Sequence, residues 1–258
     1  MKEFNVKNGN NIPIQSPLFL HPLVPYECKN QPTLFAICQG DEKRIRKYLS
    51  PTPFEYVSDI FLIAISDSRK RICLKFPNEK RPVMDCGLVF QVKYKGILGG
   101  YYMFEYEDYD YAIAAGRELW GYPKKYGKIT FSKEGKKVRG AVTKEGKTIV
   151  QIETDLSKPL NNVPKLTLYP HLNIQIMLEP DGKIFTKRII SRDTSPDYEL
   201  ISEEYGETTA FLDGVVEGLP LDPLHELMPK KVLGGGVKVG NFLASEKNGW
   251  GKVIDTLI

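Results

Sequence analysis

The stretch "AIAAGRELWGYPKKYGKI", residues 112–129, places two lysines directly after a proline and a glycine-rich apolar run. Lysine pairs are usually exposed to solvent. A lysine inside an apolar site has a lowered pKa and can attack a carbonyl. On extended backbone Lys124 and Lys125 point to opposite faces, so one of them could enter a protein interior. Because Pro-Lys-Lys recurs at 229–231, spacing alone favours two surface lysines.

Outward from this stretch, short apolar or alternating runs recur between turn signals, which is typical of antiparallel sheets. Hairpins are predicted for 137–143 with 147–154 and for 171–178 with 183–190, each closed by a glycine-containing turn. Short helices are predicted at 41–49, 111–119 and 221–228, the last with Asp222 as its cap. We expect a single domain, 1–258, that is mainly β, with a closed barrel as the natural way to remove sheet edges. The other strands are predicted at 33–38, 59–66, 71–76, 87–94, 101–108, 127–132 and 207–214.

Composition narrows the classes of function. The chain has 258 residues, 41% of them hydrophobic, and a net charge of +4 with interspersed signs. No run is long enough for a membrane helix, and the N-terminus lacks a secretory signal, so a cytoplasmic protein is expected. Four widely spaced cysteines predict buried free thiols, and three scattered histidines give no metal-site spacing. Nucleic-acid and membrane partners are not indicated.

Three other segments receive structural interpretations. In "YYMFEYEDYDY" (101–111), Glu105 and Glu107 alternate with aromatic residues, which predicts a strand with one solvent-exposed face. The segment "LGGGVKVG" (233–240) fits no phosphate-binding motif, so we expect a flexible turn or tightly packed backbone. Asp85, just before a strand, would ordinarily be a turn carboxylate.

The residues around Lys124 argue against two ordinary surface lysines, because "AIAAGRELWGYPKKYGK" closely resembles the signature of the acetoacetate decarboxylase family. The resemblance extends to "SPLF" (16–19), "RKYLSPTP" (46–53) and the hairpin at 169–190, and so covers nearly the whole chain. The signature residues in register are Gly116, Arg117, Glu118, Tyr122, Pro123, Lys124 and Lys125.

The resemblance implies that Lys124 is the nucleophile of a decarboxylase. Its amine would form a Schiff base with a β-keto acid such as acetoacetate, and the protonated imine would accept the electrons left by departing CO₂, without a cofactor. It also implies a catalytic role for Lys125 and substrate contacts from Tyr122, Glu118 and Arg117. Acetoacetate decarboxylase is itself the usual example of a lysine with a depressed pKa, and we expect desolvation to depress that of Lys124. Family members are commonly homo-oligomers, which is expected here too.

Two positions depart from the family. Gln31 stands where the resemblance places an arginine that interacts with the substrate carboxylate, so a bidentate cation is lost. Asp85 stands where it places a glutamate and keeps the charge on a shorter side chain. These departures leave two alternatives to decarboxylation. One is aldol or dehydratase chemistry through a Lys124 imine on a pyruvate-like keto acid, and the other is a non-catalytic barrel that binds a small ligand.

Overall fold

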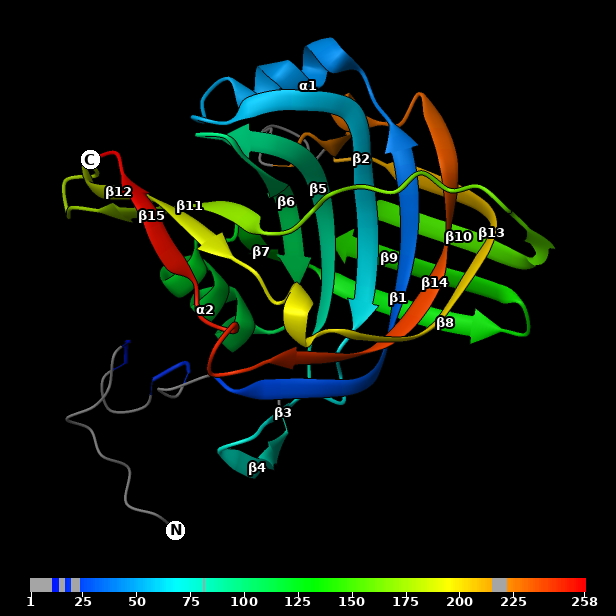
Figure 1. Ribbon diagram of the computed structural model, residues 1–258, viewed down its shortest axis with the longest axis horizontal. Helices are drawn as coiled ribbons and strands as arrows, with labels where there is room; N and C mark the ends of the chain where they lie inside the picture. Colours follow the sequence, from blue (N-terminus) through cyan, green and yellow to red (C-terminus); the bar gives the residue numbers. More distant parts are fainter. Residues whose placement is uncertain (1–10, 14–16, 20–23, 81, 215–221) are drawn as a thin grey trace.

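The structure is a computed structural model that describes residues 11–13, 17–19, 24–80, 82–214 and 222–258 (Figure 1). All strands of this part belong to one sheet. The strands are β1 Tyr26–Gln39, β2 Glu55–Asp67, β3 Ile72–Cys73, β4 Phe76–Lys80, β5 Met84–Tyr94, β6 Ile97–Glu107, β7 Lys124–Tyr126, β8 Lys128–Glu134, β9 Lys137–Lys144, β10 Lys147–Pro159, β11 His171–Leu178, β12 Ile184–Arg192, β13 Glu199–Leu212, β14 Lys231–Ala244 and β15 Lys252–Thr256.

The sheet is curled but not closed. Its order is β15-β12-β11-β6-β5-β2-β1-β14-β13-β10-β9-β8, with β15 and β8 at the two ends. The expectation of a mainly β, mainly antiparallel fold is confirmed, whereas hydrogen-bonded closure is not observed. One edge of β6 is shared by two parallel neighbours, β11 at Gly100 and β7 at Glu105–Glu107. Bulges in β1, β2 and β14 supply the curvature seen in Figure 1.

Both predicted hairpins are confirmed. β9 pairs with β10, and β11 pairs with β12. Their turns contain Gly146 and Gly182 at φ of 80° and 84°, a region that glycine enters without steric cost.

Two of the three predicted helices are confirmed. α1 (Glu42–Leu49) begins after Asp41, which accepts a hydrogen bond from the Arg44 amide, and it lies across one end of the sheet (Figure 1). α2 (Asp110–Trp120) ends at Gly121, whose φ of 69° and contact with the β11 backbone both require glycine.

Other segments differ from prediction. The proposed helix at 221–228 is a 3₁₀ turn, η3 (Leu224–Leu227), and position 221 lies outside the described residues. Asp222 does not cap it, because its carboxylate accepts hydrogen bonds from other elements instead. The run at 71–76 is split between β3 and β4. The segment 233–240 is part of β14 rather than a flexible turn, and the alternative expectation of tightly packed backbone is confirmed, because the Gly235 and Gly236 backbones touch neighbouring strands.

The central strands separate the apolar core from a cavity. Because side chains alternate between faces of a strand, each of β1, β2 and β5 sends one set of residues to each side. Leu34, Ile63, Ile65 and Leu88 pack into the main core, while their sequence neighbours face a pocket. The pocket-facing set is Thr33, Leu62, Ala64, Ser66, Asp85, Gly87 and Val89.

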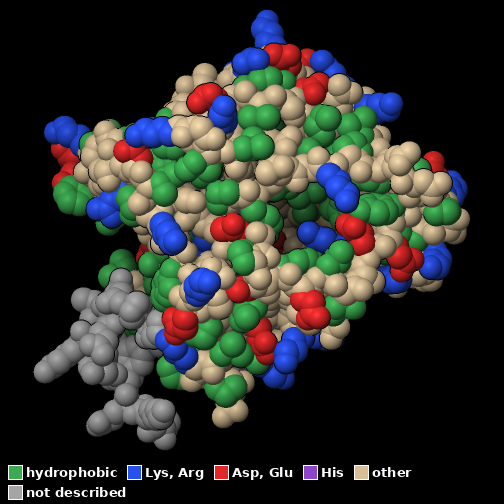
Figure 2. Space-filling model, viewed as in Figure 1, with side chains coloured by type: hydrophobic (Ala, Val, Ile, Leu, Met, Phe, Trp, Pro, Cys, Tyr) green, Lys and Arg blue, Asp and Glu red, His purple; other side chains and the backbone are tan. Residues whose placement is uncertain are grey.

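Two further expectations bear on the whole chain. All four cysteines are buried free thiols, as predicted. Within the described residues no helix is long and apolar enough to cross a membrane. On the face shown in Figure 2, basic and acidic side chains are interspersed rather than gathered in one block.

Candidate active site

A row of polar side chains crosses five adjacent strands on the face opposite the core. Each member is the direct cross-strand partner of the next, and such partners share a face of the sheet. All of them line one cavity. From β14 to β6 the row is Lys238, Thr33, Ser66, Asp85 and Glu107.

The cavity has a volume of about 250 Å³, close to the lower end of the ~300–1,000 Å³ common for ligand pockets. It therefore suits a small metabolite. Aromatic and polar residues from α2, β11, β12 and the segment before β13 form its remaining walls. Among them are Tyr111, Trp120, Tyr122, Tyr169, His171, Arg192, Thr194 and Tyr198.

Lys124 enters this cavity from β7. This strand runs parallel to β6, with Lys124 opposite Glu105, so both side chains point to the same side. Helix α2 leaves room for the lysine at Gly116, where a Cβ would lie 2.4 Å from Lys124 Cδ and 2.5 Å from Cε. Arg117 donates a hydrogen bond of 3.1 Å to the Lys124 carbonyl oxygen. The glycine and arginine of the signature thus position the lysine.

Two buried glutamates surround the Lys124 amine. Nζ donates a short hydrogen bond to Glu107 Oε1 and lies 3.3 Å from Glu105 Oε1. The glutamate side chains are only 5% and 2% exposed, for Glu105 and Glu107 respectively, and that of Lys124 is 12% exposed. The expectation that these glutamates form a solvent-exposed strand face was therefore wrong. The alternation was correct, but their face is enclosed by α2 and β7.

The carboxylates reverse the expected direction of the lysine pKa. Burial lowers the pKa of Lys124, but the negative charges of Glu105, Glu107 and Asp85 outweigh it and raise the pKa above its ordinary value. The prediction that desolvation leaves Lys124 with a depressed pKa is not met, because opposite charges within a few ångströms favour the ammonium.

The same close approach of charged groups, together with burial, raises the pKa values of two of the acids. Burial, with the charge of Glu107, raises the pKa of Asp85 to about 6, although Lys124 opposes the shift. Burial also raises the pKa of Glu105 to about 8, again against Lys124 and with help from Glu107 and Asp85. Glu105 Oε2 is buried and accepts no hydrogen bond within the described residues. At neutral pH the cluster therefore contains a neutral acid beside charged groups, which is a typical acid–base arrangement.

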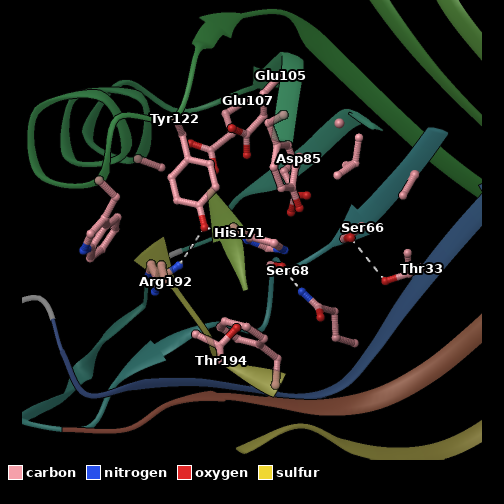
Figure 3. Close-up of a pocket in the computed structure, with 18 of the residues that line it drawn as sticks. Thr33, Ser66, Ser68, Asp85, Glu105, Glu107, Tyr122, His171, Arg192 and Thr194 are labelled. Atoms are coloured by element: carbon pink, nitrogen blue, oxygen red, sulfur yellow. Dashed lines mark hydrogen bonds between the residues drawn. The ribbon is translucent and has the colours of Figure 1, made fainter. Parts of the chain in front are cut away.

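A second polar group, made of Tyr122, His171 and Arg192, lines the same cavity (Figure 3), and the Tyr122 ring lies 5.4 Å from Lys124 Nζ. The Tyr122 hydroxyl lies 2.8 Å from His171 Nδ1 and accepts a long, 3.5 Å hydrogen bond from Arg192. Burial and the neighbouring cations lower the pKa of His171 to about 3, so its ring is neutral. Arg192 is 6% exposed and also donates to the Gly249 carbonyl and the Tyr26 hydroxyl.

Lys125 does not join this site. Its ammonium lies on the other face of β7, 2.9 Å from Asp222 Oδ1. The buried Asp222 also accepts hydrogen bonds from Tyr106 at 2.7 Å and Lys144 at 2.6 Å. The opposite-face prediction is confirmed, and this network ties β7 to β6, β9 and the segment before η3.

The sequence profile of the family described as "Acetoacetate decarboxylase (ADC)" matches residues 12–243. The chain belongs to the acetoacetate decarboxylase family. A curated acetoacetate decarboxylase of Paraburkholderia phytofirmans is 32% identical over 122 residues, which cover 46% of this chain and 44% of that protein. The match thus spans less than half of the length of that curated relative.

Solved structures agree in fold. The acetoacetate decarboxylase of Legionella pneumophila superposes with a TM-score of 0.80 at 20% identity, over 100% of this chain and 98% of that one. The enduracididine biosynthesis enzyme MppR, complexed with pyruvate, gives a TM-score of 0.73 at 18% identity, over 96% and 97% of the two chains. At these identities the similarity shows the fold alone.

Within the acetoacetate decarboxylase fold, the residues singled out from the sequence separate into two groups. Lys124, Tyr122, Asp85 and Gln31 line the cavity, and Gln31 donates a short hydrogen bond to Ser68. The exposed Arg117 and Glu118 lie outside the cavity lining, as does Lys125. The backbone carbonyl of Glu118 accepts a hydrogen bond from Gln175.

Several lining residues were missed. Glu105 and Glu107 carried a visible alternation, but nothing in the sequence shows that β7 covers them. Arg71, Arg192, His171, Tyr198 and Lys238 come from distant segments. The register of β11 with β12 places His171 and Arg192, and that of β14 with β1 places Lys238, whereas Arg71 and Tyr198 come from the connections before β3 and β13.

Proposed function

We propose that this member of the acetoacetate decarboxylase family decarboxylates a β-keto acid through a Schiff base on Lys124. The observation that carries the proposal is a buried amine that faces a metabolite-sized cavity and lies against carboxylates able to exchange its proton.

Imine formation begins with the removal of a proton from the Lys124 ammonium. Glu107 accepts this proton through its direct hydrogen bond, and the free amine then attacks the ketone carbon of the substrate. Attack leaves an alkoxide on carbon and an extra proton on nitrogen, and this proton passes to the oxygen to give a hydroxyl. Glu105, protonated at neutral pH, gives its proton to the departing hydroxyl, which leaves as water. The charged Asp85 stabilises the positive charge of the resulting iminium.

Decarboxylation then needs no further group. The electrons of the bond to the carboxylate move into the iminium, CO₂ leaves, and an enamine remains. Protonation of the enamine carbon and hydrolysis of the imine release the ketone and regenerate Lys124.

A specific observation favours a second reaction on the same imine. Gln31 replaces the cation that the family resemblance expects, and MppR, a structural neighbour, is complexed with pyruvate. Aldol or dehydratase chemistry on a pyruvate-like keto acid would begin with the same imine but would release no CO₂.

The test is borohydride reduction in the presence of acetoacetate, pyruvate or acetopyruvate, with intact mass, peptide mapping and CO₂ release followed together. We expect a reduced adduct on Lys124 and CO₂ from a β-keto acid. Lys124→Met should give no adduct, whereas Lys128→Met, an exposed lysine four residues away, should react as the wild type does. An adduct without CO₂ would support the aldol or dehydratase alternative. No adduct with any keto acid would favour a non-catalytic binding protein.

A further inference from the structure

The cavity is lined by both acidic and basic side chains. Its three carboxylates, Asp85, Glu105 and Glu107, gather around Lys124. Three other cations line the cavity, and none of them forms an ion pair with an acid in the described part of the chain. They are Arg71, Arg192 and Lys238.

Arg71 and Arg192 have neutral hydrogen-bond partners. Arg71 donates to the Tyr111 hydroxyl at 2.8 Å, and Arg192 donates to Tyr26, Tyr122 and a backbone carbonyl. Neither arginine forms an ion pair within the described residues, although the charge of Glu107 acts on Arg71 and that of Arg71 acts on Asp85. Much of the hydrogen-bonding capacity of both arginines is used.

Lys238 is the cation with the most unused hydrogen-bonding capacity. No hydrogen bond or ion pair from its ammonium is found among the described residues, and the Tyr198 ring lies 5.4 Å from Nζ. Glu203 faces it across β13 and β14 but accepts the Tyr205 hydroxyl instead. Burial lowers the pKa of Lys238, although the charges of Glu203 and Asp85 oppose the shift, so the loss of water outweighs the anions that act on its ammonium.

A second unsatisfied donor lies beside it. The Tyr198 hydroxyl is buried, lines the cavity and has no hydrogen-bond partner in the described structure. It packs on the Gly240 backbone, where a Cβ would lie only 2.2 Å from the hydroxyl oxygen. A buried donor left without an acceptor is destabilising. This hydroxyl, together with the half-buried Lys238 on the same wall, indicates a site for an acceptor that comes from a ligand.

This wall lies beside the position of the missing arginine. Gly240 is the cross-strand partner of Gln31, and Lys238 is the partner of Thr33, two residues along β1. Lys238 is thus diagonal to Gln31 and on the same face of the sheet. The neighbouring strand supplies a cation where β1 does not.

We infer that Lys238 and the Tyr198 hydroxyl bind a distal carboxylate of the substrate, so that the preferred substrates are keto acids with a second acid group remote from the reacting ketone. Thr33, Ser66 and Asp85 stand between Lys238 and Glu107 in the polar row. The single carboxylate of acetoacetate leaves as CO₂, so only a second acid group, on the other side of the ketone, can stay bound to Lys238 during the reaction. The inference rests on the proposed function for the identity of the ketone end.

The test uses two matched pairs of six-carbon acids. Adipate and hexanoate have no ketone, so their binding by titration calorimetry does not depend on imine chemistry. 3-Oxoadipate and 3-oxohexanoate differ in the same terminal group and are followed by CO₂ release. We expect adipate to bind at least tenfold more tightly than hexanoate, and kcat/KM to favour 3-oxoadipate by a similar factor.

Variants test whether Lys238 and Tyr198 cause the preference for acids with two carboxylates. Lys238→Met should abolish both preferences, and Tyr198→Phe, which removes one hydroxyl, should reduce them at least threefold. Lys231→Met, an exposed lysine on the same strand, should preserve them. Equal binding of adipate and hexanoate, or a preference unchanged in Lys238→Met, would overturn the inference even if Lys124 forms an imine. Binding of adipate through Lys238 without any imine on Lys124 would sustain the distal-carboxylate site and refute the proposed function.

Discussion

The ammonium groups of Lys124 and Lys125 lie on opposite faces of β7. Lys124 contacts Glu107 in the cavity, and Lys125 contacts Asp222 on the other side. A direct effect of one lysine charge on the other is therefore not what prepares the Lys124 amine. The carboxylates hold the proton of Lys124 close by, and Lys125 anchors the other face of β7 through its ion pair with Asp222.

We expect a bell-shaped dependence of kcat/KM on pH. The rate should rise as pH increases through about 6, where Asp85 becomes charged, and fall through about 8, where Glu105 loses the proton that it must donate. Steady-state kinetics from pH 4.5 to 9.5 measure both limbs. Asp85→Asn should remove the acidic limb and Glu105→Gln the basic limb, each with a lower maximum. A limb that persists in its variant belongs to another group.

Gly116→Ala should impair catalysis without loss of fold. The added methyl group overlaps Lys124 Cδ and Cε, so the amine must move, and a displacement of this size can reduce kcat/KM about 100-fold. Alanine is a better helix former than glycine by about 1 kcal/mol. Urea denaturation should consequently show near wild-type stability. Full activity in this variant would contradict the positioning role of Gly116.

Asp222→Ala should be strongly destabilising. The substitution leaves Lys125, Lys144 and the Tyr106 hydroxyl without their shared acceptor, which typically costs about 3–5 kcal/mol for a buried charge. Although burial opposes it, hydrogen bonding from these groups lowers the pKa of Asp222. The stabilisation is thus complete above the unfolded-state pKa of about 3.9 and is lost as pH falls through the lower folded-state value. Denaturation at pH 7 and pH 3 measures both effects, and the deficit of the variant should shrink at pH 3.

Glu105→Gln should stabilise the protein in alkaline solution. The folded-state pKa of Glu105 is about 8 and that of an unfolded glutamate is about 4.3. The folded state therefore holds an extra proton between these values, and wild-type stability falls as pH rises through this window. We expect the variant to exceed the wild type by about 1–3 kcal/mol at pH 8.5 and the difference to shrink towards pH 5. A difference independent of pH would refute this assignment.

The sequence predicted the local structure of this fold better than its long-range arrangement. Alternation and turn glycines placed β9 to β12, because those signals act over a few residues. The glycine run of β14 concealed a strand, since its pairing depends on the close approach of β1 and β13. Closure of the sheet could not be judged either, because it depends on whether the end strands β8 and β15, which are far apart in sequence, pair with each other.

The site divides in a similar way. The signature identified Lys124, but it did not show whether burial or nearby charge would dominate the amine. That balance depends on Glu105 and Glu107. The pairing of β6 with β7 places these two glutamates beside the Lys124 amine. Lys238 carried no signal at all, since its role depends on the register between β14 and β1.

The proposed reaction and the proposed binding of a distal carboxylate take place at opposite ends of the polar row. The reacting end is held by β5, β6 and β7, and the opposite end by β1 and β14. Substitutions at residues 31, 198 and 238 can thus change which acids are accepted while the bond-breaking groups stay as they are. Related enzymes could diversify in substrate by drift at one end of the row, with the chemistry at the other end inherited intact.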